Sequence, residues 1–395
     1  MAEMELILYG DGVHDDAPAI QKLLDERSAC VYLPAPKVRY CIGTTLRIHS
    51  NQTLKLDPTT VIQLMPGSSC MMLKNDREDG HENIALIGGI WDMNNLNQAP
   101  NPIYTRSVNV NWTQGAYADD EYLGVAIRFF DVFRLFVSGI TIKNPVTFGA
   151  QFAVIKQFTI ENITFDYNHG NPYAINMDGI HLDGHCRFGK ITNLQGTCYD
   201  DLLALNADDF WCGPIEDIAV DGLFAQDCHS AVRLLSAQSD VKRIHITNVF
   251  GTYYQYCIGL TRFYEKYGKR GKFDQICLSN IYAEKIPLQD FHCKPGQTFD
   301  YPIIYAESKL DIGNLQISNL HRRESQVPIS TIQIMPDTTV EVLTVTHCSM
   351  GNETGAPIPM IENRGKIGKL YTVDVECKND ELLVNTGNIE KHIQG

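Results

Sequence analysis

The sequence predicts an all-β fold in which short parallel strands stack into a solenoid, a parallel β-helix. Three observations lead to this prediction. A short pattern recurs along most of the chain, the apolar residues within it alternate with a period of two, and an Asn or Asp stands near the end of each copy. One such unit cannot bury its apolar face alone, so stacking on its neighbours must build the core.

The repeated pattern is clearest in FTIENITF, GKITNLQG, EDIAVDGLF, KRIHITNVF, DQICLSNIY and LQISNLHR. Its period-two alternation predicts short strands, and Asn and Asp tolerate the left-handed conformation that a corner needs. A β-sandwich also has many short strands, but the regular corner favours a solenoid of about ten coils. The corner residues are separated by 31, 28, 27, 32 and 39 residues and are Asn162, Asn193, Asp221, Asn248, Asn280 and Asn319.

The first 28 residues are expected to cap the solenoid, because an open end would expose strand edges that pair with other chains. In GDGVHDDAPAIQKLLDER, Asp15 or Asp16 can cap a helix and Pro18 fits its first turn. We find no linker or low-complexity segment and therefore expect one domain over residues 1–395, with C-terminal coils from about residue 265. The apolar face of the predicted helix consists of Ile20, Leu23 and Leu24.

Charge and composition exclude several classes of function. The chain has 47 acidic and 33 basic side chains, and its net charge of -14 repels a nucleic-acid backbone. No window approaches the run of about 18 apolar residues that a membrane span needs. The N-terminus shows no signal peptide, so we expect a cytoplasmic protein, or a secreted one if a leader was removed.

The cysteines predict neither disulfides nor a metal centre. All twelve stand singly, without a CxxC pair, and several lie in apolar strand-like runs. This usage favours buried reduced thiols. The sequence also shows no metal-ligand spacing and no phosphate-binding loop, so we expect neither a metal nor a cofactor.

Six aspartates lie within 32 residues, and three of them occupy equivalent places in the repeat. Asp178 stands at the entrance of the strand-like IHL, and Asp200 and Asp201 stand at the entrance of LLAL, 22 and 23 residues later. Because consecutive coils stack at roughly 4.7–4.9 Å, the three carboxylates should crowd together on one outer face. Their proximity should raise at least one pKa.

Ordinary corner residues are the alternative interpretation of any single Asp in this region, because Asp is common in turns. Asp208 and Asp209, in NADDFWCG, are expected to be turn residues of this kind. Trp211 beside them is either a sugar-stacking surface or a buried side chain.

The stretch NMDGIHL, followed by the adjacent Asp pair, resembles the NTDGIHV and DDC signature of the polygalacturonases, glycoside hydrolase family 28. The resemblance implies a right-handed parallel β-helix and hydrolysis of a glycosidic bond with inversion. By position, Asp200 would be the general acid, and Asp178 and Asp201 would hold and activate the water. Asn176 and His181, within the motif, become candidate substrate contacts.

Downstream, the family has a GHG motif and then RIK, whose Arg and Lys grip a galacturonate carboxylate. Here CHSAVRLLS places His229 at the motif histidine, so the resemblance adds it to the catalytic group. LTRFYEK places Arg262 at the family arginine, but Tyr264 replaces the lysine. Arg233, which alternation directs outward, is a candidate for the missing cation. The basic residues Lys266, Lys269, Arg270 and Lys272 form either a solvated loop or part of the substrate groove.

We therefore expect a glycosidase that cleaves a pectin-type oligosaccharide, with or without uronic acid, from one end. The exo mode is favoured because the acidic chain repels a long polyuronide. Two alternatives stay open. A β-helix lyase or epimerase would remove the proton next to a uronate carboxylate, and a carbohydrate-binding or tailspike-type protein would keep the fold without the chemistry. The sequence does not decide between a monomer and a homo-oligomer.

Overall fold

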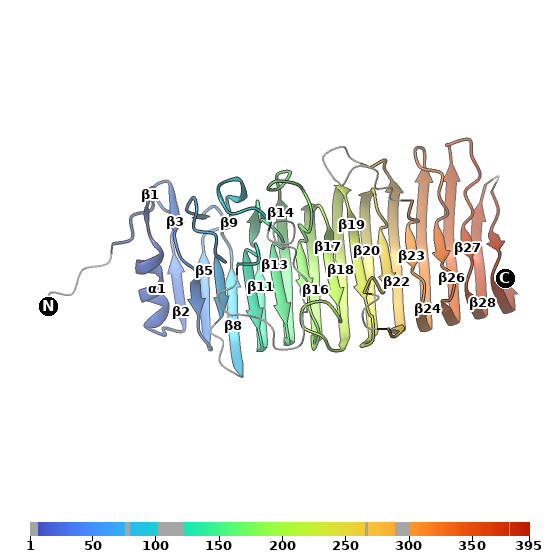
Figure 1. The fold of residues 1–395 in the computed structure, drawn as a ribbon, viewed down its shortest axis with the longest axis horizontal. Coiled ribbons are helices and arrows are strands. Elements are labelled where there is room, and N and C mark those ends of the chain that lie inside the picture. Colours follow the sequence, from blue (N-terminus) through green and yellow to red (C-terminus); the bar gives the residue numbers. More distant parts are fainter. Residues whose placement is uncertain (1–6, 76–79, 102–121, 265–267, 289–299, 379) are drawn as a thin grey trace.

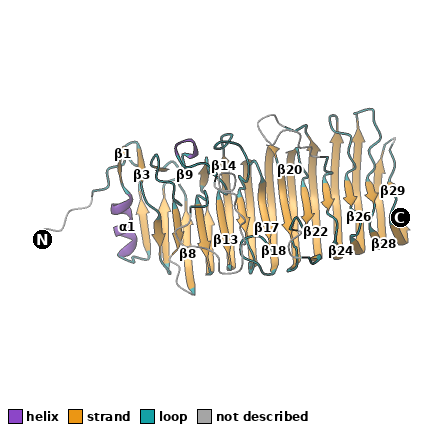
Figure 2. Cartoon of the chain, viewed as in Figure 1, coloured by secondary structure: helices purple, strands orange, loops and turns teal. Residues whose placement is uncertain are grey.

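The computed structural model describes residues 7–75, 80–101, 122–264, 268–288, 300–378 and 380–395. It shows an elongated stack of coils with the N-terminus at one end and the C-terminus at the other (Figure 1). Strands dominate the described chain, and a short helix packs at the N-terminal end (Figure 2). All the strand pairs are parallel, which confirms the predicted parallel β-helix. Within the described residues, no helix is long and apolar enough to span a membrane.

One face of the stack is a 12-stranded sheet that receives one strand from each coil, so the described chain has twelve coils rather than about ten. Its strands are β4 (Leu46–Ile48), β7 (Leu73–Asn75), β10 (Ile127–Phe130), β13 (Ala150–Ala153), β15 (Ile180–Leu182), β17 (Asp201–Asn206), β19 (Ser230–Leu235), β21 (Ile258–Thr261), β23 (Ile304–Ala306), β25 (Ile332–Ile334), β27 (Ile361–Asn363) and β29 (Leu383–Asn385).

The other strands form an 18-stranded sheet that wraps the remaining faces. They are β1 (Asp11–Asp15), β2 (Cys30–Leu33), β3 (Arg39–Ile42), β5 (Gln52–Leu56), β6 (Val61–Leu64), β8 (His81–Ile87), β9 (Ile90–Asp92), β11 (Val132–Ser138), β12 (Thr141–Lys143), β14 (Lys156–Asp166), β16 (Arg187–Thr197), β18 (Ile215–Cys228), β20 (Asp240–Tyr253), β22 (Gly271–Lys285), β24 (Leu310–Glu324), β26 (Thr339–Asn352), β28 (Lys366–Cys377) and β30 (Asn388–Gln394). A 3-10 helix spans Asn95–Asn97.

The predicted Asn corners lie inside long strands, where they bend the chain without breaking the ladder. Asn162 and Asn193 have positive φ angles of 57° and 56°, and Asn193 donates a hydrogen bond of 2.7 Å to Asn162 in the coil before it. Two predicted short strands therefore appear as one bent strand in each of these coils. Side-chain hydrogen bonds continue the stack at Asn248, Asn280 and Asn319.

Asp221 is an exception among the predicted corner residues. Thr192 and Thr247, which precede the asparagines of the adjacent coils, are its register partners, so the left-handed position falls on Gly222, with φ of 82°. Glycine adopts positive φ without the steric cost that a side chain brings. The Asp221 carboxylate still joins the stack, because it accepts a hydrogen bond of 2.7 Å from Asn248.

The predicted N-terminal helix is present as α1 (Ala17–Asp25), with Pro18 in its first turn. Ile20 and Leu24 are fully buried against the first coils. The Asp16 side chain does not cap the helix. It is buried and accepts backbone hydrogen bonds from Tyr9, Gly10 and Cys41, so it fastens the N-terminal segment to β3 instead.

We predict that Leu24→Ala will lower the free energy of unfolding by about 2–5 kcal/mol, because it leaves a cavity between α1 and the first coil. Urea denaturation monitored by circular dichroism measures the change. Lys22→Ala, on the exposed side of the same helix, is the matched control and should alter stability by less than about 0.5 kcal/mol. Equal effects of the two substitutions would contradict a packing role for the helix.

Candidate active site

The three predicted aspartates meet at the entrances of two adjacent strands. Asp178 precedes β15, and Asp200 and Asp201 stand at the start of β17, whose Leu203 pairs with Ile180. The backbone amide of Asp201 donates a hydrogen bond of 3.2 Å to Asp178 Oδ1. A Cβ at Gly179 would lie 2.5 Å from the carbonyl oxygen of Leu202, so the motif glycine permits this close stacking.

The face that carries these aspartates is covered. Only 3% of Asp178 and 1% of Asp201 is exposed, whereas 16% of the Asp200 side chain reaches solvent. Alternation correctly predicts which side chains of these strands point outward. Phe210, in the segment after β17, lies edge-on to His181, and Phe148 stacks on the same ring. Both belong to a small apolar cluster that consists of Leu123, Val125, Phe148 and Phe210, with Trp211 partly buried against it.

All three carboxyl groups have raised pKa values, whereas the sequence predicted a raised pKa for at least one of them. Burial is the main cause in each case, and neighbouring carboxylates add to it. The pKa of Asp178 rises to about 6, because hydrogen bonding to His181 offsets part of the burial effect. The pKa values of Asp200 and Asp201 rise to about 7, with the charge of Arg233 acting in the opposite direction.

His181 holds Asp178 in place from the buried side. Its Nδ1 lies 2.6 Å from Asp178 Oδ2, and its ring stacks on Phe148 with the centroids 4.2 Å apart. Burial disfavours a charged imidazole, but the nearby carboxylates of Asp183 and Asp178 outweigh it and raise the pKa of His181 well above its usual value. The raised pKa favours the charged imidazole, which pairs with Asp178, and His181 is only 1% exposed.

Two further aspartates surround the other side of His181. Its Nε2 lies 3.4 Å from Asp183 Oδ1 and 3.6 Å from Asp209 Oδ2. The hydroxyl of Tyr264 donates a hydrogen bond to Asp209 Oδ1. Asp209 is thus part of the site rather than a simple turn residue, and Tyr264, at the position of the family lysine, supports it. The sequence analysis assigned no role to Asp183, although it belongs to the same short motif.

Arg233 is the cation of this site. Its Nε lies 3.0 Å from Asp201 Oδ2 and also donates a hydrogen bond of 2.8 Å to the hydroxyl of Tyr256. Its Nη2 lies 3.5 Å from Asp200 Oδ1. As predicted, Arg233 points outward between the buried Val232 and Leu234. The hydroxyl of Ser230 also donates a hydrogen bond to Asp201.

His229 lies beside the predicted general acid, with its Nδ1 3.4 Å from Asp200 Oδ1 and its ring edge-on to Tyr254. Ligand atoms of Asp200, Asp201 and His229 lie within 4.8 Å of one another, a spacing that a metal ion could use. A cation there would face the guanidinium of Arg233, which already neutralises both carboxylates. The arrangement therefore suits protonated or ion-paired carboxyl groups better than a metal ion.

Other predicted residues lie farther from this cluster or serve the fold. Arg262 follows β21, and its Nε donates a hydrogen bond of 2.6 Å to the carbonyl of Lys269, so its contact with substrate stays a prediction. Asn176 is half-buried and left-handed, with φ of 55°. Asp208 accepts three backbone hydrogen bonds from residues 237–239 and is a structural turn residue. Trp211 is half-buried and edge-on to Phe130.

The basic residues 266–272 do not gather at the three aspartates. Those that the structure describes make contacts elsewhere on the surface. Arg270 pairs with Asp311 and Asp337, and Lys269 donates a hydrogen bond to Gln238. Lys266 lies outside the described residues.

The fold and the buried acidic cluster define a parallel β-helix protein with stacked carboxyl groups at its strand entrances. No protein-family model and no curated protein sequence matches the chain. Among solved structures, it is similar to the hyperthermoactive exopolygalacturonase of Thermotoga maritima, with a TM-score of 0.61 and 14% identity over 92% of this chain and 89% of that one.

Two further solved structures show how far the similarity extends. The family 28 exopolygalacturonase of Yersinia enterocolitica matches with a TM-score of 0.55 and 13% identity over 98% of this chain and 76% of that one. The A-module of the mannuronan C-5 epimerase AlgE6 of Azotobacter vinelandii matches with a TM-score of 0.57 and 11% identity over 98% and 97%. The predicted resemblance is thus confirmed for the fold, while the reaction must be argued from the site.

The raised carboxyl pKa values predict that Asp200→Asn will stabilise the protein at pH 8 by about 1–3 kcal/mol and will have little effect at pH 4. A carboxyl group whose pKa is raised on folding stabilises the native state while it is protonated, and this stabilisation is lost as the pH rises through about 7. Urea unfolding at both pH values measures the difference.

Asp217→Asn is the control for this prediction. Hydrogen bonds from Arg243 and Arg187 lower the pKa of Asp217 to about 2, so its ionised form stabilises the fold above its usual pKa. This substitution should lower stability at pH 8. The same direction of change in both variants would contradict the assigned carboxyl pKa values.

Proposed function

We propose that the protein is a glycoside hydrolase that cleaves a pectin-type oligosaccharide with inversion. One observation carries the proposal: three carboxyl groups share one buried site but have different partners. Asp178 contacts His181, whereas Asp200 and Asp201 contact Arg233, and burial raises the pKa values of all three to about 6–7. Carboxyl groups that titrate near neutral pH in different surroundings can serve as acid and base in one reaction.

Asp200 is the best candidate for the general acid, because it is the most exposed of the three and its pKa, raised to about 7, lets the side chain hold a proton near neutral pH. It gives this proton to the glycosidic oxygen as the bond to the leaving sugar breaks. Asp178, ionised above a pKa of about 6, accepts a proton from the attacking water. Asp201, fixed by Ser230, holds the same water, which attacks from the opposite face of the sugar.

Proton abstraction by a lyase or epimerase is less well supported by this site. Apart from the aspartates, which the proposed hydrolysis already uses, such a reaction would need a phenol, imidazole or guanidinium that has lost its proton near neutral pH. Tyr256 lies against Arg233, but burial raises its pKa well above the usual value, and the charges on His181 and Arg233 also make them poor bases. The appearance of an unsaturated, ultraviolet-absorbing product would favour a lyase and oppose the proposed hydrolysis.

Tyrosines beyond Arg233 offer surface for a neighbouring sugar ring. Tyr256, Tyr301 and Tyr305 pack with ring centroids 4.9–6.0 Å apart, and Tyr301 and Tyr305 are partly exposed. The apolar faces of sugars stack on aromatic rings, as nucleic-acid bases do. Cleavage from one end of a short chain remains our proposal, and Arg233, beside Asp200 and Asp201, is our candidate partner for a sugar carboxylate.

We predict that Asp200→Asn will abolish turnover while substrate still binds, because an amide keeps the size of the side chain but cannot deliver a proton. Asp178→Asn and Asp201→Asn should also be severe. Reducing-end assays on a panel of pectic oligosaccharides, with product anomers read by NMR, make the test. Asp217→Asn should retain activity. Activity above about a tenth of the wild-type value in all three site variants would exclude this site. Each substitution would then have raised the activation barrier by less than roughly 1.4 kcal/mol.

A second prediction concerns the pH profile. Arg233→Ala removes a cation that lowers the pKa values of Asp200 and Asp201, so the acid stays protonated to higher pH. The alkaline limb of the kcat profile, expected near pH 7, should therefore move upward. Arg262→Ala is the comparison and should leave the limb in place while changing KM for an acidic sugar. A fixed limb in Arg233→Ala would contradict the electrostatic role.

A further inference from the structure

A row of stacked aromatic rings crosses the outer surface of the 18-stranded sheet. Phe224 pairs in register with Phe250, Phe250 with Tyr282, and Tyr282 with His321. The ring centroids are 5.2, 5.1 and 5.3 Å apart. Phe224 is 43% exposed and Tyr282 is 45% exposed. We call these four residues the aromatic row, and they come from strands β18, β20, β22 and β24.

The surface is hollowed at both ends of the aromatic row. The register continues from Phe224 to Gln195 in one direction and from His321 to Ser349 and Glu376 in the other. One hollow, of about 490 Å³, borders Phe224 and Phe250, and a second, of about 930 Å³, borders Tyr282 and His321. Gly251 lines both hollows, so they adjoin on the same sheet face, and we call the two hollows together the groove.

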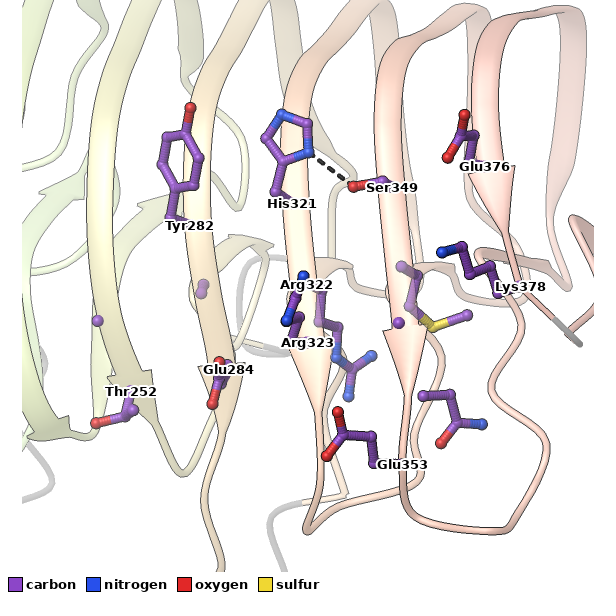
Figure 3. A pocket seen from close by; sticks show the side chains of 15 residues that line it. Thr252, Tyr282, Glu284, His321, Arg322, Arg323, Ser349, Glu353, Glu376 and Lys378 are labelled. Carbon is purple, nitrogen blue, oxygen red and sulfur yellow. Dashed lines mark hydrogen bonds between the residues drawn. The ribbon is translucent and has the colours of Figure 1, made fainter.

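The larger hollow is rimmed by charged side chains that have no ion pair or hydrogen bond with described residues. Figure 3 shows Tyr282, His321, Ser349 and Glu376 on four adjacent strands, with the charged side chains around them. His321 is fixed by a hydrogen bond of 2.8 Å to Ser349. The charged side chains are Glu284, Arg323, Glu353, Glu376 and Lys378.

Stacking explains why the rings contact one another, but it does not explain why charged side chains gather around the larger hollow. Elsewhere in the same sheet exposed charges form ion pairs, as Lys242 and Arg243 do with Glu216. Burial and the nearby carboxylate of Glu324 raise the pKa of Glu284. A ligand that donates hydrogen bonds to the carboxylates and accepts them from Arg323 and Lys378 would satisfy both kinds of group.

The shape and charge of the groove define its occupant. From Gln195 to Glu376 the register crosses seven strands, an extent of six strand spacings or roughly 29 Å, which suits an extended chain. A polyanion would meet three carboxylates, and a second copy would bring a net charge of -14. The sheet face offers a peptide no free strand edge for backbone pairing.

We propose that this groove is a non-catalytic binding site for a neutral polysaccharide chain. Sugar rings have apolar faces that pack against the exposed aromatic row, and their hydroxyl groups both donate to carboxylates and accept from Arg and Lys. The groove lies around one corner from the active site. Thr197, which lines the smaller hollow, is three residues before Asp200, and the buried Cys198 and Tyr199 separate them.

The test measures binding without turnover. Proteins carrying Asp200→Asn migrate through native gels that contain neutral galactan, neutral arabinan or polygalacturonate, and dissociation constants are derived from the retardation. At least one neutral polymer should retard the protein. Adding Tyr282→Ala or Arg323→Ala should weaken this binding by about tenfold or more.

The control is Phe188→Ala, because Phe188 is 51% exposed on β16 but lies outside the aromatic row. It should change the dissociation constant by less than about twofold. Tyr282→Phe keeps the stacked ring and should retain most of the binding. Circular dichroism verifies that each variant is folded, and the Arg323 variant tests the groove without removing a ring.

Two outcomes of the gel assay would overturn the proposal. One is the absence of retardation by both neutral polymers, whether or not polygalacturonate retards the protein, and the other is retardation that Tyr282→Ala and Arg323→Ala leave unchanged. Light scattering that shows a dimer dissociated by Tyr282→Ala would assign the groove to self-association instead. Binding that depends on Tyr282 in a protein without glycosidase activity would support the groove and oppose the proposed hydrolase, so the two proposals fail separately.

Discussion

The spacing between stacked strands controls the rest of this structure. Each residue of a coil lies roughly 4.8 Å from its register partner in the next coil, and the backbone hydrogen bonds leave little freedom to change this distance. Side chains far apart in sequence are therefore arranged in columns. Asp178 and Asp201 meet for this reason, and so do the rings of Phe224 and Phe250. The same spacing thus builds both the acidic site and the aromatic row.

Stacking carboxyl groups so closely conflicts with burying them. A buried carboxylate is costly unless it is paired, protonated or hydrogen bonded. The site uses all three devices: Arg233 pairs with Asp200 and Asp201, the raised pKa values keep a proton available, and His181 holds Asp178. The burial that creates this conflict also raises the pKa values of all three aspartates toward neutrality, which acid and base catalysis can use.

The repeat allowed the fold to be predicted because its period survives in the sequence. Asn162 and Asn193 themselves take the left-handed corner conformation, so the sequence located these corners directly. The corner predicted at Asp221 lies one residue later, because Gly222 takes the left-handed conformation there without being Asn or Asp. Strand entrances also placed Asp178, Asp200 and Asp201 correctly. Alternation alone distinguishes inside from outside, so it could not reveal that Phe210, in the segment after β17, packs against His181, which is one of the most buried residues.

Contacts across the site were harder to predict where they depend on loops. Tyr264 reaches Asp209 from 55 residues away, and neither belongs to a strand of the repeat. Asp183 was missed although it belongs to the NMDGIHLDG motif, where its spacing from His181 could have indicated a contact. The charges around Tyr282, which form no ion pair with described residues, come from four coils and become neighbours only through the register of strands β22, β24, β26 and β28.

The Asn corners also bear on how quickly such a chain can fold. Their intervals of 27–39 residues are the sequence separations that most contacts between coils must close. Dividing a typical interval of about 30 by 395 residues gives a relative contact order of roughly 0.08, a value otherwise seen in helical bundles and well below that of β-sandwiches. Loop closure for each added coil is therefore short and repetitive. An all-β chain of this kind can grow from any early pair of coils by successive local steps, so its assembly is closer to the lengthening of a filament than to the closure of a barrel.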